Sequence, residues 1–456
     1  MTHPLFALDE EFARQVFAYC RDRLSLDPVP LDYGGLLPIP DGVLDNLFSE
    51  TGRSAEEVLA LYRDHLAPSI ISVDSTACLA FIPNAPSKMS SLFDMVIAAS
   101  GLAGTNWVEA AGAVAAENQA LEFLARRAGL PAGAGGTFVP GGTAGNLSAL
   151  TVARDVGRAR HPDIAPHEVR IALSEEAHSS IGTALHVIGV TPLYVPTDDH
   201  RLTRRALEAA LARDPHPETV VGVVATAGTT NAGIIDDLEG LGSFAREHDL
   251  WFHVDGAYGG AAMFSSSHRE QLSGLRHANS FIVDPHKWLF APFDCCALIY
   301  REPTLARHYL AQRAGYLDIT HEETHGVEDW NPSDFALHLS RRARGLPFWF
   351  SLAVHGVTAY ESAVEAAIEL ARRTAELVEA SDHLKLVRPP GLSVVLFRRP
   401  GWNRDDYFAW SHRLLREQIA FVVPTTWEGE TIGRVVFLHP DTPLETVERI
   451  IESARD

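Results

Sequence analysis

Short apolar runs alternate with amphipathic segments through the middle of the chain. The runs cover residues 168–173, 192–195, 220–226, 251–254, 280–283 and 295–300. The segments between them carry apolar residues at helical spacing, and strands that alternate with helices are typical of a mostly parallel sheet covered on both faces. The pattern therefore predicts an α/β protein whose ligand binds beyond the carboxyl ends of the strands.

The chain before this region shows a different pattern. Ser54 and Glu57 stand three residues apart at the start of an amphipathic segment, which predicts a capping box and a helix. Residues 26–40 contain four prolines and two glycines, which favours an extended arm. Arms that lack a core of their own often wrap around a partner subunit, so we expect an interface here.

The pattern changes again after residue 346. A long helix is predicted at residues 358–379, and a last helix is predicted with Thr442 as its N-cap, Pro443 at its first position and Glu445 completing a capping box. Strands are predicted at residues 384–387, 392–397 and 435–438. This mixture indicates a small α+β domain.

A chain of 456 residues is too long for one compact core. The patterns divide it into three parts: an N-terminal helical arm and interface segment (1–70), a large ligand-binding domain (71–345) and a small C-terminal α+β domain (346–456). Hydrophobic residues make up 46% and charged residues 21% of the chain, which are values of a globular protein.

The charge balance limits the classes of partner. The chain carries 38 basic and 59 acidic side chains, a net charge of −21, which repels nucleic-acid backbones and anionic lipids. Its four cysteines show neither a disulfide framework nor metal-ligand spacing. The first residues lack a signal-peptide pattern, and no apolar run is long enough to span a bilayer. We expect a cytoplasmic protein without a metal, a nucleic-acid partner or a membrane partner.

Two charged residues stand at the ends of predicted strands. Lys287 follows the run 280–283 beside a proline and aromatic residues, and partial burial there would lower its pKa, as an imine-forming amine requires. Asp255 ends the run 251–254 and needs a cationic partner if it is buried, such as a protonated pyridine nitrogen. The alternatives are a surface lysine and a helix cap.

Further polar residues fall at equivalent places. Gly142 and Thr143 follow a strand and open a helix, whose backbone N–H groups attract phosphate, and Asn146 adds a side-chain donor. His178 follows another strand and could stack on a cofactor ring or guide a carboxylate, although a lone histidine is more often a core or cap residue. Thr226 ends a third strand. Together with Asp255 and Lys287, these residues describe a site for pyridoxal 5'-phosphate (PLP).

The sequence resembles the group II PLP-dependent decarboxylases from about Ser72 onward. The most specific motif is Asp-Pro-His-Lys-Trp at residues 284–288, followed by Phe-Asp-Cys at 293–295. His-Val-Asp-Gly-Ala-Tyr at 253–258 and Ala-His-Ser-Ser at 177–180 accompany it. The resemblance implies a PLP-dependent transferase of fold type I, like aspartate aminotransferase, built as an obligate homodimer with the site at the subunit interface.

The resemblance also implies roles for single residues. Lys287 would join the cofactor in a Schiff base, with His286 beside it. Asp255 would pair with the pyridine nitrogen, while Ala257 and His178 would pack on the two faces of the ring. The remaining cofactor contacts would be Gly142 and Thr143 at the phosphate and Thr226 near the ring.

The same resemblance suggests a substrate pocket and a mobile catalytic loop. The pocket positions are Phe81, Ile82, Asn84 and Trp107, which favour an apolar or aromatic side chain, although ordinary interface packing would explain them equally well. In the loop, about residues 316–332, Val327 stands where aromatic decarboxylases carry a tyrosine. His325 is then our candidate for the acid that protonates Cα.

The predicted reaction is decarboxylation of an L-amino acid to the amine and carbon dioxide. The nearest alternative keeps the cofactor but lets oxygen intervene, which gives an aldehyde, ammonia and hydrogen peroxide. An aminotransferase is less favoured because no motif places an arginine for a second carboxylate. A catalytically silent dimeric binding protein is a further alternative, against which the joint presence of Lys287, Asp255 and His178 argues.

Overall fold

The computed structural model describes residues 3–45, 47–315 and 330–455. Its centre is a seven-stranded sheet in the order β1-β7-β6-β5-β4-β2-β3. The strands are β1 (Gly135–Val139), β2 (Arg170–Ser174), β3 (Thr191–Val195), β4 (Val220–Thr226), β5 (Trp251–Asp255), β6 (Ser280–Val283) and β7 (Cys296–Tyr300). Strands from β3 to β6 run parallel, and β7 is antiparallel to β6 and β1. The predicted mostly parallel sheet is confirmed.

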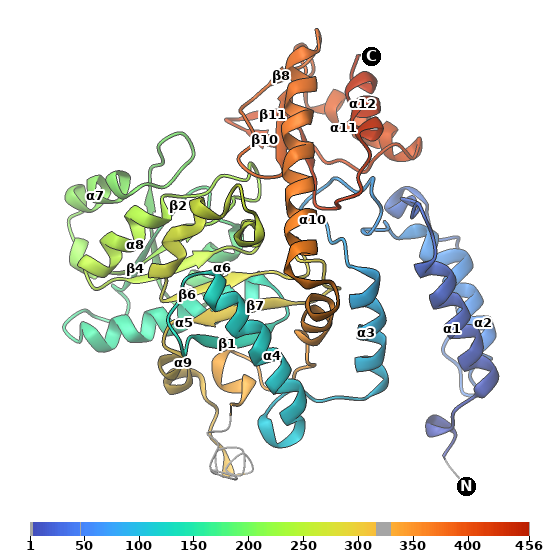
Figure 1. Ribbon diagram of the computed structural model, residues 1–456, viewed down its shortest axis with the longest axis horizontal. Coiled ribbons are helices and arrows are strands. Elements are labelled where there is room, and N and C mark those ends of the chain that lie inside the picture. The colour runs from blue at the N-terminus through green and yellow to red at the C-terminus, as the bar shows by residue number, and fades with distance from the viewer. Residues whose placement is uncertain (1–2, 46, 316–329, 456) are drawn as a thin grey trace.

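Helices cover both faces of this sheet (Figure 1). One face packs against α5 (Gly142–Arg160), α6 (Ser179–Val187) and α9 (Pro303–Leu310), and the other against α4 (Trp107–Arg127), α7 (Arg204–Arg213) and α8 (Leu238–Glu247). Residues of β6 alternate accordingly, with Ile282 in the first core and Phe281 and Val283 in the second. Strands buried on both faces explain the continuous apolar runs of the sequence.

A second, antiparallel sheet forms the small domain. It comprises β8 (Lys385–Leu386), β9 (Val394–Arg398), β10 (Thr425–Trp427) and β11 (Glu430–Val436), with α11 (Arg404–Arg416) and α12 (Leu444–Ser453). The long helix α10 (Leu346–Ala380) leads into it and is interrupted at Gly356, whose φ of 73° suits glycine. Figure 1 shows α10 rising from the large domain to the small one.

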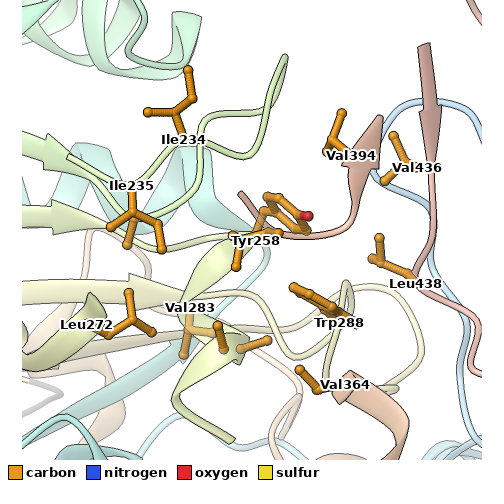
Figure 2. Packing of buried hydrophobic residues seen from close by; sticks show 14 of the residues in the cluster. Ile234, Ile235, Tyr258, Leu272, Val283, Trp288, Val364, Val394, Val436 and Leu438 are labelled. Carbon is orange, nitrogen blue, oxygen red and sulfur yellow. The ribbon is translucent and has the colours of Figure 1, made fainter. Parts of the chain in front are cut away.

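One apolar core joins the two sheets. Figure 2 shows Tyr258 and Trp288 of the large domain facing Val394, Val436 and Leu438 of the small domain. The rings of Tyr258 and Trp288 stack with centroids 5.3 Å apart, and both side chains are buried. The small domain therefore packs against the segment around Tyr258, just after the end of β5.

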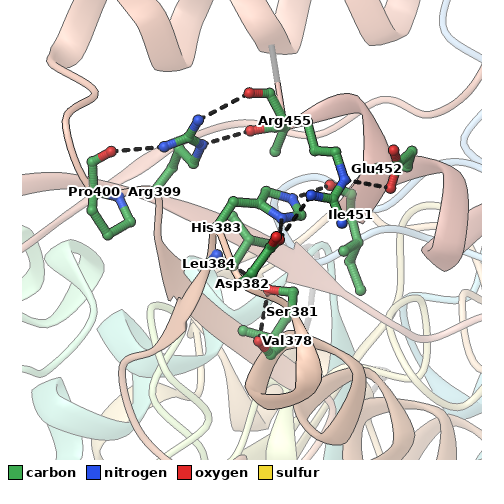
Figure 3. Close-up of polar contacts among 11 residues, drawn as sticks. Val378, Ser381, Asp382, His383, Leu384, Arg399, Pro400, Ile451, Glu452 and Arg455 are labelled. Carbon is green, nitrogen blue, oxygen red and sulfur yellow. Dashed lines mark hydrogen bonds and ion pairs between the residues drawn. The ribbon is translucent and has the colours of Figure 1, made fainter.

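Within the small domain, polar contacts join α12 and the residues after it to the segments around residues 383 and 399 (Figure 3). His383 Nε2 lies 2.9 Å from the carbonyl oxygen of Ile451. Arg399 Nε donates to the carbonyl oxygen of Ala454 at 2.7 Å. The predicted cap of this last helix is wrong, because the Thr442 hydroxyl donates to the carbonyl of Thr76 and α12 begins only after Pro443.

The N-terminal segment contributes little to these cores. Its main helices are α1 (Glu10–Leu24) and α2 (Ala55–Leu61), followed by shorter helical turns. The next helix, α3 (Lys88–Ala99), lies beyond this segment. The predicted capping box of Ser54 and Glu57 is present at α2. Neither α1 nor α2 contains a buried residue, and Figure 1 shows both at the edge of the molecule.

The four cysteines differ in accessibility. Cys78, Cys295 and Cys296 are buried, whereas Cys20 on α1 is half-buried. Across the described residues, no helix is long and apolar enough to cross a membrane, and no group of histidine, cysteine and acidic side chains could hold a metal ion.

Candidate active site

The predicted cofactor residues meet in one cavity of about 200 Å³ at the carboxyl ends of the parallel strands. It is lined by Gly141, Gly142, Thr143, Asn146, His178, Ser180, Thr226, Gly228, Thr230, Asp255, Ala257, Tyr258, Asp284, His286 and Lys287. Each of the nine cofactor-binding residues expected from the sequence is among them. The strand ends thus bring together segments that are more than 100 residues apart in the chain.

The start of α5 forms the floor on which a phosphate would sit. The helix begins at Gly142 after an extended Gly141, and no side chain caps it. A Cβ atom at Gly142 would lie 3.3 Å from both the Ala257 Cβ and an Asp284 oxygen, so glycine keeps this space open. Uncapped backbone N–H groups at a helix start bind anions, and the first turn therefore fits the phosphate of PLP.

Lys287 Nζ lies 3.0 Å from Asp284 Oδ2, three residues earlier in the chain. Burial by itself lowers the pKa of Lys287, but Asp284 and Asp255 outweigh it and the pKa is raised. The predicted lowering of this pKa is therefore wrong for the site without a ligand, because the sequence-based argument considered burial and not the neighbouring carboxylates.

Asp255 is a buried carboxylate with hydrogen-bond donors on both oxygens. Oδ1 accepts the backbone N–H of Ala257 at 3.1 Å, and Oδ2 accepts the side-chain amide of Asn146 at 3.0 Å. Within the described part of the chain, Asp255 forms no ion pair, and the nearby Thr226 hydroxyl is buried without a hydrogen-bond partner. A buried carboxylate and an unpartnered hydroxyl on one wall suit a ring with a protonated nitrogen and polar substituents.

Two histidines of the pocket accept hydrogen bonds at the same ring atom. His178 Nδ1 accepts the backbone N–H of Ser180 at 3.2 Å, and His286 Nδ1 accepts the backbone N–H of Cys295 at 3.0 Å. Burial lowers the pKa of His286, which favours its neutral form. Because Nδ1 accepts in both rings, the ring proton lies on Nε2, which can donate to an anionic group.

Asn146 lies in the pocket but has partners that the sequence did not suggest. Its side chain is 1% exposed and contacts Asp255, Ser180 and His253. Both amide hydrogens are used in these contacts, so Asn146 has none left for the phosphate for which it was predicted.

The predicted substrate residues lie away from this cavity within one chain. The ring of Phe81 is 62% exposed and packs edge-on against Phe421. Ile82 packs against the main core, and Trp107 begins α4, where its backbone N–H donates to Asn331 Oδ1. Asn84 is buried, with no hydrogen-bond partner for either amide atom among the described residues. The loop candidate, His325, lies outside the described residues.

Sequence reasoning missed two residues that shape the pocket. Arg434 on β11 is 5% exposed and donates to the carbonyl oxygens of Thr230 and Asn231, so the small domain holds one wall of the cavity. An arginine inside the apolar run 432–438 was the signal. Asp284 was visible in its motif, and its spacing from Lys287 was the signal for the ion pair.

Comparison with protein families decides the class. The family model described as the pyridoxal-dependent decarboxylase conserved domain matches residues 41–399. The chain belongs to this family. Its relatives that are named decarboxylases are PLP-dependent carboxy-lyases, which confirms the predicted enzyme class and the predicted cofactor.

Relatives of this decarboxylase differ in the reactions that their names state. An aromatic-L-amino-acid decarboxylase from Bacillus atrophaeus is 32% identical over 88% of this chain and 85% of its own length. An L-2,4-diaminobutyrate decarboxylase from Rhizobium meliloti is also 32% identical, over 79% of this chain and 73% of its own. A 4-hydroxyphenylacetaldehyde synthase from Rhodiola rosea is 28% identical over 85% of this chain and 81% of its own length.

The fold of the decarboxylase matches solved structures closely. The crystal structure of Oryza sativa TDC with PLP and tryptamine has a TM-score of 0.88 and 23% sequence identity, and the match covers 100% of this chain and 99% of that one. The likeness confirms the expected fold type I architecture.

Proposed function

We propose that this enzyme removes the α-carboxylate of an L-amino acid with an aromatic or apolar side chain, giving the amine and carbon dioxide. The observation that carries the proposal is the meeting of Lys287, Asp255, His178 and the uncapped start of α5 in one cavity. When bound, PLP supplies an electron sink for the bond that breaks at Cα. The residues of the chain decide how the cofactor and substrate are held around that bond.

Each group has a distinct task in this proposal. The first turn of α5 would hold the phosphate, and the Lys287 amine would be the group that anchors the cofactor. Asp255 would keep the ring nitrogen protonated. The Nε2–H groups of His178 and His286 donate to anionic groups of the cofactor or the substrate carboxylate.

The side chain of the substrate would be recognised where two subunits meet. Phe81, Ile82, Asn84 and Trp107 are candidates that a second chain could place beside the cavity. The Asn84 amide supports this assignment, since a buried amide without a partner is costly unless another molecule satisfies it. None of the four positions is an arginine, which disfavours acidic substrates.

Exposed apolar residues support a homodimer. Phe6, Leu8 and Phe17 of the N-terminal segment are 80%, 73% and 63% exposed, and Leu92 and Val96 on α3 are 43% and 53% exposed. Apolar surface of this extent is unfavourable on a monomer and is typical of a protein interface. We propose that the partner subunit covers it and that both chains contribute to each active site.

A screen of common amino acids with the purified PLP-loaded enzyme tests the function. Carbon dioxide, amine and hydrogen peroxide are measured together for each substrate. The proposal expects carbon dioxide and amine in equal amounts with an aromatic or apolar substrate, and no activity with aspartate or glutamate. Carbon dioxide from diaminobutyrate alone would contradict the proposed substrate class.

The second candidate is an aldehyde synthase, and the peroxide measurement separates the two. The observation in its favour is Val327, which cannot donate a proton where the related aromatic decarboxylases carry a tyrosine. If His325 is the acid that replaces the tyrosine, His325→Ala should lower the amine yield and raise peroxide. Peroxide equal to carbon dioxide in the wild type would establish the aldehyde reaction instead.

A further inference from the structure

A continuous chain of hydrogen bonds runs through the side chain of Asn146, behind the cofactor pocket. Asn146 Nδ2 lies 3.0 Å from Asp255 Oδ2 and 3.0 Å from Ser180 Oγ. Asn146 Oδ1 lies 2.9 Å from His253 Nε2. The amide has two hydrogens and both are used, so a side chain on α5 is bonded at once to β5 and to the start of α6.

The Asp255 side chain, with both oxygens facing donors, fixes the direction of every bond in this chain. A carboxylate only accepts, so the NH₂ group of Asn146 must face it and the carbonyl oxygen must face His253. His253 therefore carries its proton on Nε2. Burial lowers the pKa of His253 to about 4, against the opposing effect of Asp255, so the ring is neutral and its Nδ1 accepts from the Ser280 hydroxyl at 2.9 Å.

The Ser280 oxygen in turn accepts the indole N–H of Trp251 at 2.9 Å, which completes this arm of the chain. Every donor on it therefore meets an acceptor, and His253 is 0% exposed. Reversing the Asn146 amide would put two acceptors against each other at Asp255 and two donors against each other at His253. The orientation is thus determined by several groups at once.

The other arm reaches His178. Because Ser180 Oγ accepts from Asn146, its hydrogen is directed to His178 Nδ1 at 2.9 Å, which already accepts the backbone N–H of Ser180. The two residues assigned to the cofactor ring, Asp255 and His178, are thereby linked through one amide. A displacement of Asn146 would disturb both.

We propose that Asn146 is a positioning residue. It holds Asp255 in the orientation that receives the ring nitrogen of PLP, and through Ser180 it fixes the position of His178 relative to Asp255. The proposal rests on the proposed function, since it assumes the roles given above to Asp255 and His178. It removes Asn146 from the phosphate contacts. It also assigns a role to His253, which supports Asn146 from behind without touching the ligand.

Binding of two ligands by the full-length apoprotein tests this role. The ligands are PLP and an analogue in which a CH group replaces the ring nitrogen, and the dissociation constants are compared as a ratio. A charge-assisted hydrogen bond to Asp255 should give the wild type about a tenfold preference for PLP. In Asn146→Ala the preference should fall to about twofold or less, because Asp255 is no longer held in place.

The ratio of dissociation constants separates a positioning role from general destabilisation of the protein, because general destabilisation would weaken the binding of both ligands equally. Thr151→Val is the matched control, because Thr151 is a buried polar residue on the same helix, and among the described residues its hydroxyl bonds only the carbonyl of Leu147. It should keep the wild-type ratio. An unchanged ratio in Asn146→Ala would overturn the positioning role of Asn146 and leave the proposed function intact. A wild type that shows no preference for PLP over the analogue would overturn the role of Asp255 as well.

Neutron diffraction from wild-type crystals gives a second test that needs no variant. The expected result is a deuteron on His253 Nε2 and two deuterons on Asn146 Nδ2, directed at Asp255 and Ser180. An amide turned the other way, or a His253 protonated only on Nδ1, would refute the assignment even if Asn146→Ala failed to fold.

Discussion

The cofactor pocket and the N-terminal segment satisfy their side chains in opposite ways. In the pocket, Asp255, Asn146 and Lys287 all find partners within the same chain. Along α1 and α2, no residue is buried and large apolar side chains such as Phe17 remain exposed. The side chains of one region are satisfied by its own fold, whereas the other region presents apolar side chains that the described residues do not cover.

In the proposed dimer, this difference would separate properties of the subunit from properties of the assembly. The groups proposed to hold the cofactor are placed by the strand ends of one sheet, so a single chain suffices to bring them together. The exposed apolar segments lie outside this cavity, as does the Asn84 amide, which has no hydrogen-bond partner among the described residues. Substrate selection is thus expected to depend on the dimer more strongly than cofactor binding does.

Loss of Lys287 should have the largest effect on the pocket. We expect Lys287→Ala to abolish the covalent link to PLP and to lower turnover by about a thousandfold or more, because the amine that holds and releases the cofactor is gone. Borohydride reduction followed by peptide mass spectrometry measures the link. The chain has only two other lysines, Lys88 and Lys385, and reduced cofactor on either one would disprove the assignment.

The next largest effect is expected from Asp255. Asp255→Ala should lower kcat by about a hundredfold or more while the fold is kept, since a neutral ring is a poorer electron sink. Replacing His178 with glutamine should be severe but less complete. Steady-state rates and circular dichroism of both variants are compared, and near-normal turnover by Asp255→Ala would contradict the proposed chemistry.

A substitution on α1 tests the other side of the comparison. Phe17→Asp should weaken the dimer by about tenfold or more, because it puts a charge into the proposed interface. Sedimentation velocity over a range of protein concentrations measures this change. Arg14→Asp introduces the same side chain at an exposed polar position of α1 and should change the dimer less. A wild type that sediments as an active, PLP-loaded monomer would rule out the interface.

The smallest effect concerns a partly exposed contact between α10 and the turn at residues 265–267. Glu365 accepts hydrogen bonds from Ser265, Ser266 and Ser267. Burial raises the pKa of Glu365, but these bonds outweigh it and lower the pKa from 4.5 to about 2. The folded pKa is below the unfolded one, so the stabilisation is present above pH 4.5 and is lost as the pH falls toward 2.

We therefore expect Glu365→Gln to lower the melting temperature at neutral pH by about 1 °C, in keeping with the loss of about 1 kcal/mol from charged hydrogen bonds in a chain of 456 residues. The difference from the wild type should shrink between pH 4.5 and pH 2. Glu361→Gln, on the same helix, is the control. A difference that stays constant over this range would show that ionisation of Glu365 is irrelevant to stability.

Much of the large domain was predictable because its signals are local. Every residue of β4 is apolar or small and buried, and the motif residues each follow such a run. The short strand β10 was missed, although Glu428 and Gly429 have positive φ and form the two-residue turn of a hairpin with β11. Three residues are too few to show an alternating pattern.

The contacts that were not predicted depend on residues far apart in the chain. The partners of Asn146 lie 34, 107 and 109 residues away, and a sequence offers no signal for which of them its amide will meet. The glycines before it suggested a phosphate site, and the amide was assigned to that site by proximity. The pKa of Lys287 was misjudged for a related reason, since burial was weighed without Asp284.

The uneven burial of the cysteines provides a natural attachment point for spectroscopic labels. The thiolate is the form of cysteine that attacks thiol reagents, and burial raises the pKa of Cys78 to about 12 and the pKa values of Cys295 and Cys296 well above the usual value. Only Cys20, on α1, is half-buried. A maleimide fluorophore or a nitroxide would therefore attach there without any engineered residue, and the separation of two such labels could be followed while the N-terminal helices of two subunits associate.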